Sequence, residues 1–260
     1  MSASALSGVL DCPLRWFLAR EAGGESGRST SLGFGSVIHA LADHKSREET
    51  VDEARLLALL DSVWSQLQFD SPWIGDREHA EAEHALRRFV AWADGRPGRE
   101  LLGSEQGFEV EVPLEDGENV ALRGKVDRVE RDAAGNIRII DFKTSKNAPA
   151  GTSLPDDPQL GLYQLAVEQG GMAELCGADA RSGGAELVQL RIDVGGYPKV
   201  QEQGPQKPDD AGRKPIEIQL ISAVDVVRSE TFDATVNAYC ARCDFATMCP
   251  AQQRSGTVLS

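Results

Sequence analysis

The sequence Gly124-Lys125-Val126-Asp127-Arg128 is followed, one short turn later, by Ile139-Ile140-Asp141-Phe142-Lys143-Thr144. Both segments have the alternation of β-strands, and the residues between them have the composition of a hairpin turn. Residues two apart on a strand project from the same face, so Asp141 and Lys143 share one face while Phe142 points into the core on the other. The pattern predicts two neighbouring strands that bring two carboxylates and one lysine together.

This group of side chains suits a divalent cation. Mg²⁺ and Mn²⁺ prefer oxygen ligands, and they bind through few carboxylates together with waters and substrate phosphate oxygens. A nearby ammonium can orient or help to deprotonate the attacking water and offset the charge that builds on phosphorus. An Asp-x-Lys tripeptide alone is better explained as an ion pair on an edge strand. Asp127 on the preceding strand favours catalysis, and the pattern then predicts phosphodiester hydrolysis.

Helices are predicted before these strands. The first covers Ser4 to Arg20 and is followed by a glycine-rich loop at Gly23 to Gly35. The second contains Val37, Ile38 and Leu41. A long helical region then covers Val51 to Ala93, with a break at Ser71-Pro72. After Gly95-Arg96-Pro97 the pattern changes to strands. These cover Glu105 to Leu114, Val120 to Arg131 and Ile137 to Thr144, with turns at Glu115-Asp116-Gly117 and at Asp132 to Asn136.

Further elements are predicted after the Asp-x-Lys strand. Asp157-Pro158 combines a capping acceptor with a proline at the first helical position, and it opens a helix that ends at Gly170-Gly171. Two more strands are predicted at Glu186 to Val194 and at Ile216 to Ile221, with a polar mobile segment at Gly195 to Pro215 between them. A last helix follows at Ser222 to Val227. The order predicts an α/β fold with a mixed sheet flanked by helices.

The composition is that of a soluble globular protein. The 260 residues carry a net charge of −14, and 41% of them are hydrophobic. No run approaches the roughly 18 apolar residues of a membrane span, and the N-terminus lacks the pattern of a secretion signal. We therefore expect a cytoplasmic protein with no membrane partner. The negative charge argues weakly against indiscriminate nucleic-acid coating, and it does not exclude a local binding groove.

Two further motifs accompany the strand pair, and together they resemble a known family. Gly35-Ser36-Val37-Ile38-His39 lies upstream, and Gln159-Leu160-x-x-Tyr163 lies downstream. With Gly124-x-x-Asp127 and Asp141-x-Lys143, these motifs resemble the RecB-like branch of the PD-(D/E)xK nuclease superfamily. The resemblance covers Cys12 to Cys249. It implies a restriction-endonuclease-like mixed central β-sheet flanked by helices.

The resemblance also implies roles for individual residues. The expected metal ligands are His39, Asp127, Asp141 and the carbonyl of Phe142. The expected catalytic group is Lys143, while Gln159 and Tyr163, one turn apart on a helix, position the DNA strand or the lysine. Glu105 is similar to a family acidic residue one strand earlier, although Glu109 and Glu111 compete for that place. His44, His79 and His84 match nothing in the family pattern.

The cysteines form a separate signal. Cys240-x-x-Cys243-x5-Cys249-Pro250 lies near the end of the chain, and Cys12-Pro13 lies near its start. In a reducing compartment this clustering favours a metal over a disulfide. Zinc and an iron-sulfur cluster both accept four cysteines, and the spacing alone slightly favours zinc. We assign no function to Cys176.

The family resemblance favours the iron-sulfur interpretation. Helicase-nucleases of the AddB and AdnAB types and CRISPR adaptation nucleases place one cysteine before the nuclease core and three after it, around a 4Fe-4S cluster. Such a cluster would clasp the N- and C-terminal segments together. The implied organisation is one RecB-like nuclease domain over residues 1–260, with an N-terminal helix (1–30), a nuclease core (31–235) and a cluster-binding tail (236–260).

The function implied is a metal-dependent DNA nuclease. We expect it to act on single-stranded DNA or DNA ends, as an exonuclease or endonuclease in end processing and recombinational repair. The chain lacks a Gly-x4-Gly-Lys-Ser/Thr phosphate loop and is therefore not itself the motor. The resemblance to the AdnAB class implies a UvrD-like helicase or helicase-nuclease as a partner, with the chain either a free nuclease or a module of a larger helicase. The alternative is a catalytically silent DNA-binding or scaffold module of a helicase-nuclease, which would lack a ligand or the lysine. A redox protein built on the cysteines ranks last.

DNA binding by an acidic chain requires local positive charge. Basic residues are expected to line a groove at the site, and aromatic Tyr163 or Trp16 to stack a base. The basic residues are Arg123, Lys125, Arg128, Lys143 and Lys146.

Overall fold

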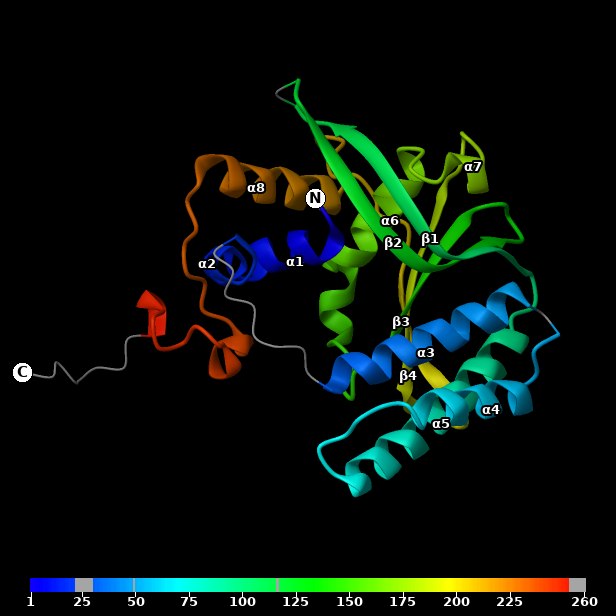
Figure 1. The fold of residues 1–260 in the computed structure, drawn as a ribbon. Helices are drawn as coiled ribbons and strands as arrows, with labels where there is room; N and C mark the ends of the chain where they lie inside the picture. Colours follow the sequence, from blue (N-terminus) through cyan, green and yellow to red (C-terminus); the bar gives the residue numbers. More distant parts are fainter. Residues whose placement is uncertain (22–29, 49, 116, 253–260) are drawn as a thin grey trace, which may run out of the picture.

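A five-stranded mixed sheet forms the centre of the fold (Figure 1). The computed structural model describes residues 1–21, 30–48, 50–115 and 117–252. The strand order is β1-β2-β3-β4-β5, and every neighbouring pair is antiparallel except β3 and β4. The strands are β1 (Arg99–Pro113), β2 (Asn119–Asp132), β3 (Ile137–Lys143), β4 (Ser182–Val194) and β5 (Tyr197–Gln203). The predicted α/β class with a mixed sheet is confirmed.

Helices cover both faces of this sheet (Figure 1). One face carries α1 (Ala3–Asp11), α6 (Pro158–Glu168) and α8 (Pro215–Ser229), and the other carries α3 (Thr30–Arg47), α4 (Glu53–Trp64) and α5 (Pro72–Asp94). The shorter elements are α2 (Pro13–Trp16), a π-helical turn (Phe17–Glu21), η2 (Gly151–Asp156), α7 (Ala173–Cys176), η3 (Ala238–Arg242) and η4 (Pro250–Gln252).

Strand β3 divides its side chains between two hydrophobic cores. Ile137 and Ile139 belong to the core under α1, α6 and α8, whereas Ile140 and Phe142 belong to the core under α3, α4 and α5. Each such buried side chain stabilises the fold by about 1.5–3 kcal/mol. This alternation fixes the register of β3, and it sends Asp141 toward α6 while Phe142 packs toward α3 and α5.

A close contact explains the glycine that precedes Asp127 on β2. Gly124 pairs with Phe108 of β1, and a Cβ at this position would lie 2.7 Å from Phe108 Cζ. The aromatic ring therefore occupies the space that any larger residue would need. Gly124 allows β1 and β2 to pack closely next to the predicted site.

The C-terminal part of the sheet differs from the sequence prediction. Ile216 to Ile221 is the start of helix α8 and not a strand. Pro215 stands at the first helical position, and the Lys214 N–H donates to the Glu217 carboxylate at 2.7 Å as part of a capping box. A six-residue apolar window cannot separate a buried strand from a helix, and the continuation to Val224 at helical spacing decides the matter.

The missing strand is β5, inside the segment predicted to be a mobile polar loop. Gly195 and Gly196 both have positive φ and form the two-residue turn from β4. The inward residues of β5 include Gln201 and Gln203 rather than apolar side chains. Gln203 Nε2 donates to the Leu154 carbonyl at 2.9 Å, so β5 holds the connection that leads from β3 to α6.

Other predicted elements are confirmed with changed bounds. The helix predicted over Ser4 to Arg20 breaks at Cys12-Pro13 into α1, α2 and the π-helical turn. The predicted break at Ser71-Pro72 is the start of α5, and Asp157 caps α6 as expected. Residues 23–29 of the predicted glycine-rich loop lie outside the described residues, and the rest of it, up to Gly35, belongs to α3 and is not a loop. Within the described ranges, no helix has both the length and the apolarity needed to cross a membrane.

Candidate active site

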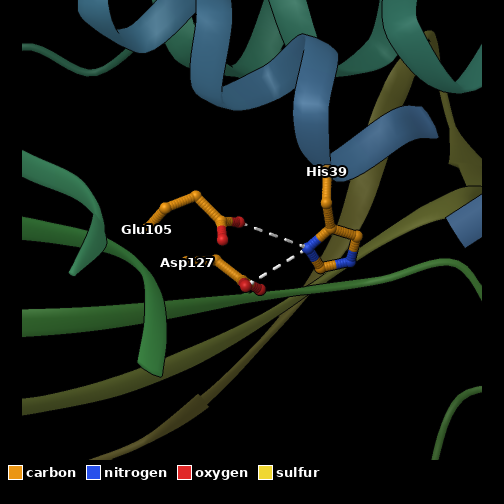
Figure 2. Close-up of side chains that lie close together, drawn as sticks. All are labelled: His39, Glu105 and Asp127. Carbon is orange, nitrogen blue, oxygen red and sulfur yellow. Dashed lines mark hydrogen bonds and ion pairs between the residues drawn. The ribbon is translucent and has the colours of Figure 1, made fainter. Parts of the chain in front are cut away.

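His39 of α3, Glu105 of β1 and Asp127 of β2 converge at one point (Figure 2). His39 Nδ1 lies 3.2 Å from Asp127 Oδ1 and 3.9 Å from Glu105 Oε1. One potential ligand atom from each residue lies within 4.8 Å of the other two. The structure thus brings two predicted ligands together with the glutamate that the sequence matched only weakly.

Glu105 owes its position to an unusual backbone conformation. It has a φ of +49°, in the left-handed region that side chains other than glycine rarely adopt. Glu109 and Glu111, which competed for this role, lie further along β1, where they face Arg123 and Asn119. Non-glycine residues in this region cost about 1–3 kcal/mol and concentrate at functional sites. The strained backbone is consistent with a functional role for the Glu105 carboxylate.

The point of convergence is where β2 and β3 separate. Their backbone pairing ends at Arg128 and Ile140. Just beyond it, the carboxylate of Asp127 accepts the Phe142 N–H at 2.6 Å and so replaces a strand carbonyl. This hydrogen bond fixes Asp127 and joins the His39 group to the end of β3.

A second group of side chains lies at the end of β3, on the α6 side. Lys143 Nζ lies 2.7 Å from Asp141 Oδ2 and donates to Gln159 Oε1 at 2.8 Å. Gln159 Nε2 is 2.8 Å from both Asp141 Oδ1 and the Tyr163 hydroxyl. The Gln-x-x-x-Tyr spacing thus places both α6 side chains on the Asp141-Lys143 pair. The lysine is held by two partners.

Burial and mutual charge shift the pKa values of the site. Burial raises the pKa of Asp141 to about 6, although the neighbouring Lys143 ammonium opposes this shift. Burial of His39 lowers its pKa, but the hydrogen bond and charge of Asp127 outweigh this effect, and the pKa is raised overall. Burial likewise raises the pKa of Tyr163, which keeps its hydroxyl protonated. Perturbed groups of this kind concentrate at functional sites.

The residues fit a hard divalent cation. One imidazole and two carboxylates are a donor set that suits Mn²⁺ or Mg²⁺. Asp141 does not join the His39 group within 4.8 Å, because Lys143 and Gln159 engage its carboxylate. Phe142 contributes its N–H to Asp127, and its side chain packs against Phe89 and Trp92. A second His-carboxylate group, made of Asp61, His79 and Glu83, lies on α4 and α5.

The raised pKa of His39 leads to a prediction about pH. A divalent cation needs the neutral imidazole, so protons and cations compete for the site. Below the raised pKa of His39, the affinity for Mn²⁺ should fall by about tenfold per pH unit. Isothermal titration between pH 6 and 8 measures this slope. His39→Asn should flatten the slope and weaken binding, and an unchanged slope in this variant would exclude His39 as a ligand.

The strained conformation of Glu105 leads to a second prediction. Glu105→Gly removes the strain of the left-handed backbone conformation, but it also increases the conformational entropy of the unfolded chain. The two effects oppose each other, so the free energy of unfolding should change by less than about 1 kcal/mol. The affinity for Mn²⁺ should nevertheless fall at least about tenfold, because a ligand is lost. Glu109→Gly on the same strand is the control, and it should lose stability and keep the affinity. The reverse pattern would contradict the role of Glu105.

A pocket of about 740 Å³ opens over the His39 group. Ten residues from α3, β1, β2 and the end of β3 line it, and Lys125 and Arg47 are its basic members. Thr144 lies against Gly35 of α3, where a Cβ would come within 3.1 Å of its hydroxyl. The glycine of the histidine motif thus lets α3 approach the end of β3.

The predicted basic groove is only partly correct. Arg128 is buried and donates to Glu130 at 2.7 Å, and Lys146 extends to Glu78 of α5. Arg123 pairs with Glu109 and does not line the pocket, so it is not part of the groove. The predicted base-stacking residues are also engaged elsewhere. Tyr163 is buried against Phe108 and Gln159, and Trp16 packs near Phe232. Sequence alone could not show that an arginine next to Asp127 belongs to a buried ion pair.

Four cysteines line one small pocket between α2 and the C-terminal tail, and they are Cys12, Cys240, Cys243 and Cys249. Two backbone N–H groups point at their sulfurs, from Thr235 to Cys12 and from Asn237 to Cys240. No three cysteine sulfurs of the described chain lie within 4.8 Å of one another. The pocket gathers the predicted residues without the tight spacing of a single-metal site.

The tail also contacts the N-terminal helices directly (Figure 1). Asn237 Nδ2 donates to the Asp11 carbonyl at 2.9 Å, and the Leu14 N–H donates to the Asp233 carbonyl at 3.2 Å. The rings of Phe17 and Phe232 stack with centroids 4.6 Å apart. The two ends of the chain are thus held together by protein contacts. Residues 253–260, which include the end of the predicted tail, lie outside the described part.

Comparison with known proteins gives one family. A model described as the PD-(D/E)XK nuclease superfamily matches residues 1–250. A solved structure titled "Crystal structure of SSO0001" is 17% identical, with 97% of this chain and 86% of that chain covered and a TM-score of 0.45. No curated protein matches the sequence.

Proposed function

Because the chain belongs to the PD-(D/E)XK nuclease superfamily, we propose that it is a divalent-metal-dependent deoxyribonuclease that hydrolyses phosphodiester bonds. Its mixed five-stranded sheet flanked by helices is a restriction-endonuclease-like α/β fold. Members of this superfamily are generally nucleases that use Mg²⁺ or Mn²⁺. The observation that carries the proposal is that the His39-Glu105-Asp127 group lies close enough to Asp141 for the charges of Asp127 and His39 to shift the pKa of Asp141, while Asp141 and Gln159 hold Lys143.

The proposed mechanism gives each side chain a task. His39, Glu105 and Asp127 would hold the cation, which would supply Lewis acidity for phosphodiester hydrolysis. Lys143 orients the attacking water and offsets the negative charge that develops on the phosphoryl oxygens. Asp141 and Gln159 keep the ammonium in place, and Tyr163 fixes Gln159.

We propose single-stranded DNA or DNA ends as the substrate. The preference for single strands and ends is what the resemblance to the RecB-like branch implies, and the pocket of about 740 Å³ over the His39 group is where the substrate backbone would lie. The chain retains every ligand and the lysine of the motifs, which favours an active enzyme over the silent scaffold alternative.

A substrate panel tests this proposal. End-labelled single-stranded DNA, blunt duplex DNA, circular single-stranded DNA and RNA are incubated with the protein and Mn²⁺. We expect cleavage of linear single-stranded DNA first, and product lengths then distinguish exonuclease from endonuclease action. Cleavage of RNA alone would contradict the proposed substrate. Binding without cleavage of any substrate would favour the scaffold.

We also propose that the four cysteines bind a 4Fe-4S cluster. The shared pocket brings Cys12 of the N-terminal segment together with the three cysteines of the tail, and four thiolates are the ligand set of a 4Fe-4S cluster, with zinc as the alternative occupant. The N–H groups that point at Cys12 and Cys240 would lower the charge on the sulfurs.

Anaerobic purification tests the cluster. The wild type should be brown and contain about four irons per chain, and Cys240→Ser should lose most of the iron and several degrees of melting temperature. Cys176→Ser is the matched control, because this cysteine lies outside the pocket. One zinc per chain and no iron would contradict the cluster and support the alternative occupant.

The proposed role is end processing in DNA repair. An enzyme of the RecB-like branch with an AddB-type or AdnAB-type cluster would act beside a UvrD-like helicase that feeds it single strands. Both the DNA substrate and the reduced thiols belong to the cytoplasm. Co-purification with such a helicase, and stimulation of cleavage by its ATP-driven unwinding, would support this role.

A further inference from the structure

Lys125, one of the basic residues expected to line the groove, lies at the metal group. It stands on β2 two residues before Asp127, and its ammonium forms an ion pair with Glu105 Oε2. The other oxygen of the same carboxylate, Oε1, faces His39 Nδ1 at 3.9 Å. The hydrogen bond to Glu105 also raises the pKa of Lys125, which keeps the ammonium charged. One carboxylate is thus shared between a lysine and the site of the cation.

The shared carboxylate makes the two cations competitors. A divalent ion on Glu105 would lie only a few ångströms from the ammonium, and like charges at this distance repel strongly in a partly buried site. The side chain of Lys125 is 60% exposed, and lysine has a flexible stem, so the ammonium can leave without a large cost. Arrival of the cation should therefore displace Lys125 from Glu105.

The pocket offers the displaced ammonium a new partner. Lys125 lines the same pocket as His39 and Asp127, where the proposed DNA backbone would lie. The other basic residue of the pocket, Arg47, already pairs with Asp43 at 2.9 Å. Lys125, in contrast, loses its partner Glu105 when the divalent cation binds that carboxylate. A phosphate next to the scissile bond can take over that partnership.

We propose that Lys125 is an exchangeable counter-ion: it neutralises Glu105 until the divalent cation binds, and it then contacts a phosphate of the DNA. The first half of this proposal, the displacement of Lys125 from Glu105, concerns the protein and the cation alone. The second half, the contact between Lys125 and a DNA phosphate, rests on the proposed nuclease function. The exchange would couple loading of the cation to binding of the substrate.

Manganese titration followed by electron paramagnetic resonance, without DNA, tests the first half. Lys125→Gln should bind Mn²⁺ about five- to tenfold more tightly than the wild type, because a competing positive charge is gone. Lys125→Arg should restore the wild-type affinity. Arg123→Gln is the matched control. It removes the same charge two residues away on β2, where the arginine pairs with Glu109 outside the pocket, and it should change the affinity less than twofold.

DNA binding tests the second half. Affinity for a labelled single strand is measured with Mn²⁺ in the Lys143→Ala background, which prevents cleavage. Adding Lys125→Gln should weaken binding about five- to tenfold and reduce the salt dependence by about 0.7 in the log–log slope, the value of one phosphate contact on a single strand. Adding Arg123→Gln should change neither by as much.

The outcomes separate the possible failures. Unchanged or weaker Mn²⁺ binding by Lys125→Gln would overturn the counter-ion. Tighter Mn²⁺ binding with unchanged DNA affinity would overturn the phosphate contact and leave the counter-ion supported. Failure of the wild type to bind Mn²⁺ at all would overturn the proposed function and the exchange with it.

Discussion

Lys143→Ala is expected to lower the rate of DNA cleavage by about 10³-fold. Lys143 Nζ lies 2.7 Å from Asp141 and 2.8 Å from Gln159, so the ammonium is fixed at the end of β3 by these two side chains. A preorganised charge of this kind stabilises the developing phosphoryl charge at no further cost in reorganisation. The effect should fall on the chemical step, and single-turnover cleavage at saturating DNA measures it.

The control for this variant is Lys146→Ala. Lys146 lies in the loop that follows β3 and pairs with Glu78 of α5, so its loss should change the rate only a few fold. Manganese binding by Lys143→Ala should stay close to that of the wild type, because the His39 group is intact. A rate within tenfold of the wild type, or an equal loss in Lys146→Ala, would exclude the assigned role.

Asp127→Asn is expected to weaken Mn²⁺ binding strongly and to abolish cleavage. Asp127 faces His39 at 3.2 Å and is central to the cation group, so the loss of its charge should weaken Mn²⁺ binding about 100-fold or more. The fold should survive, because the amide oxygen of asparagine can still accept the Phe142 N–H. Titration calorimetry and thermal melting together measure the two effects.

Glu111→Gln provides the comparison for Asp127→Asn. Glu111 lies on the exposed side of β1 and accepts from Asn119, so its neutralisation should leave Mn²⁺ binding and cleavage unchanged. Normal Mn²⁺ affinity in Asp127→Asn would show that the cation binds elsewhere. A large loss of stability in Asp127→Asn would instead show that Asp127 stabilises the packing of β2 against β3.

The arrangement of β2 and β3 could be predicted from sequence because its causes are local. The alternation of Ile139, Asp141 and Lys143 against Ile140 and Phe142 fixes which side chains share a face. The Gln159-Tyr163 spacing fixes a helix face in the same way. Periodicity of this kind needs no knowledge of the rest of the fold, so it predicted the groups that meet at Asp141.

Other features depend on contacts that a single sequence does not show. Gln203 is buried in β5 because it donates a hydrogen bond to the connection before α6. A strand whose buried residues are polar lacks the hydrophobic alternation by which a strand is predicted from sequence. Ile216 to Ile221 was too short a window to reveal a helix. Glu105 reaches His39 through its left-handed backbone, which neither strand periodicity nor composition indicates.

Metal dependence of DNA cleavage tests the central claim most directly. Protein that has been treated with a chelator and returned to buffer is incubated with 5′-labelled single-stranded DNA, with and without Mn²⁺. The iron content is measured in the same samples, so that loss of the cysteine-bound cluster is not mistaken for loss of the catalytic cation. The account predicts cleavage only after Mn²⁺ is restored. Equal cleavage without added metal, or none in samples that hold both the cluster and Mn²⁺, would contradict it.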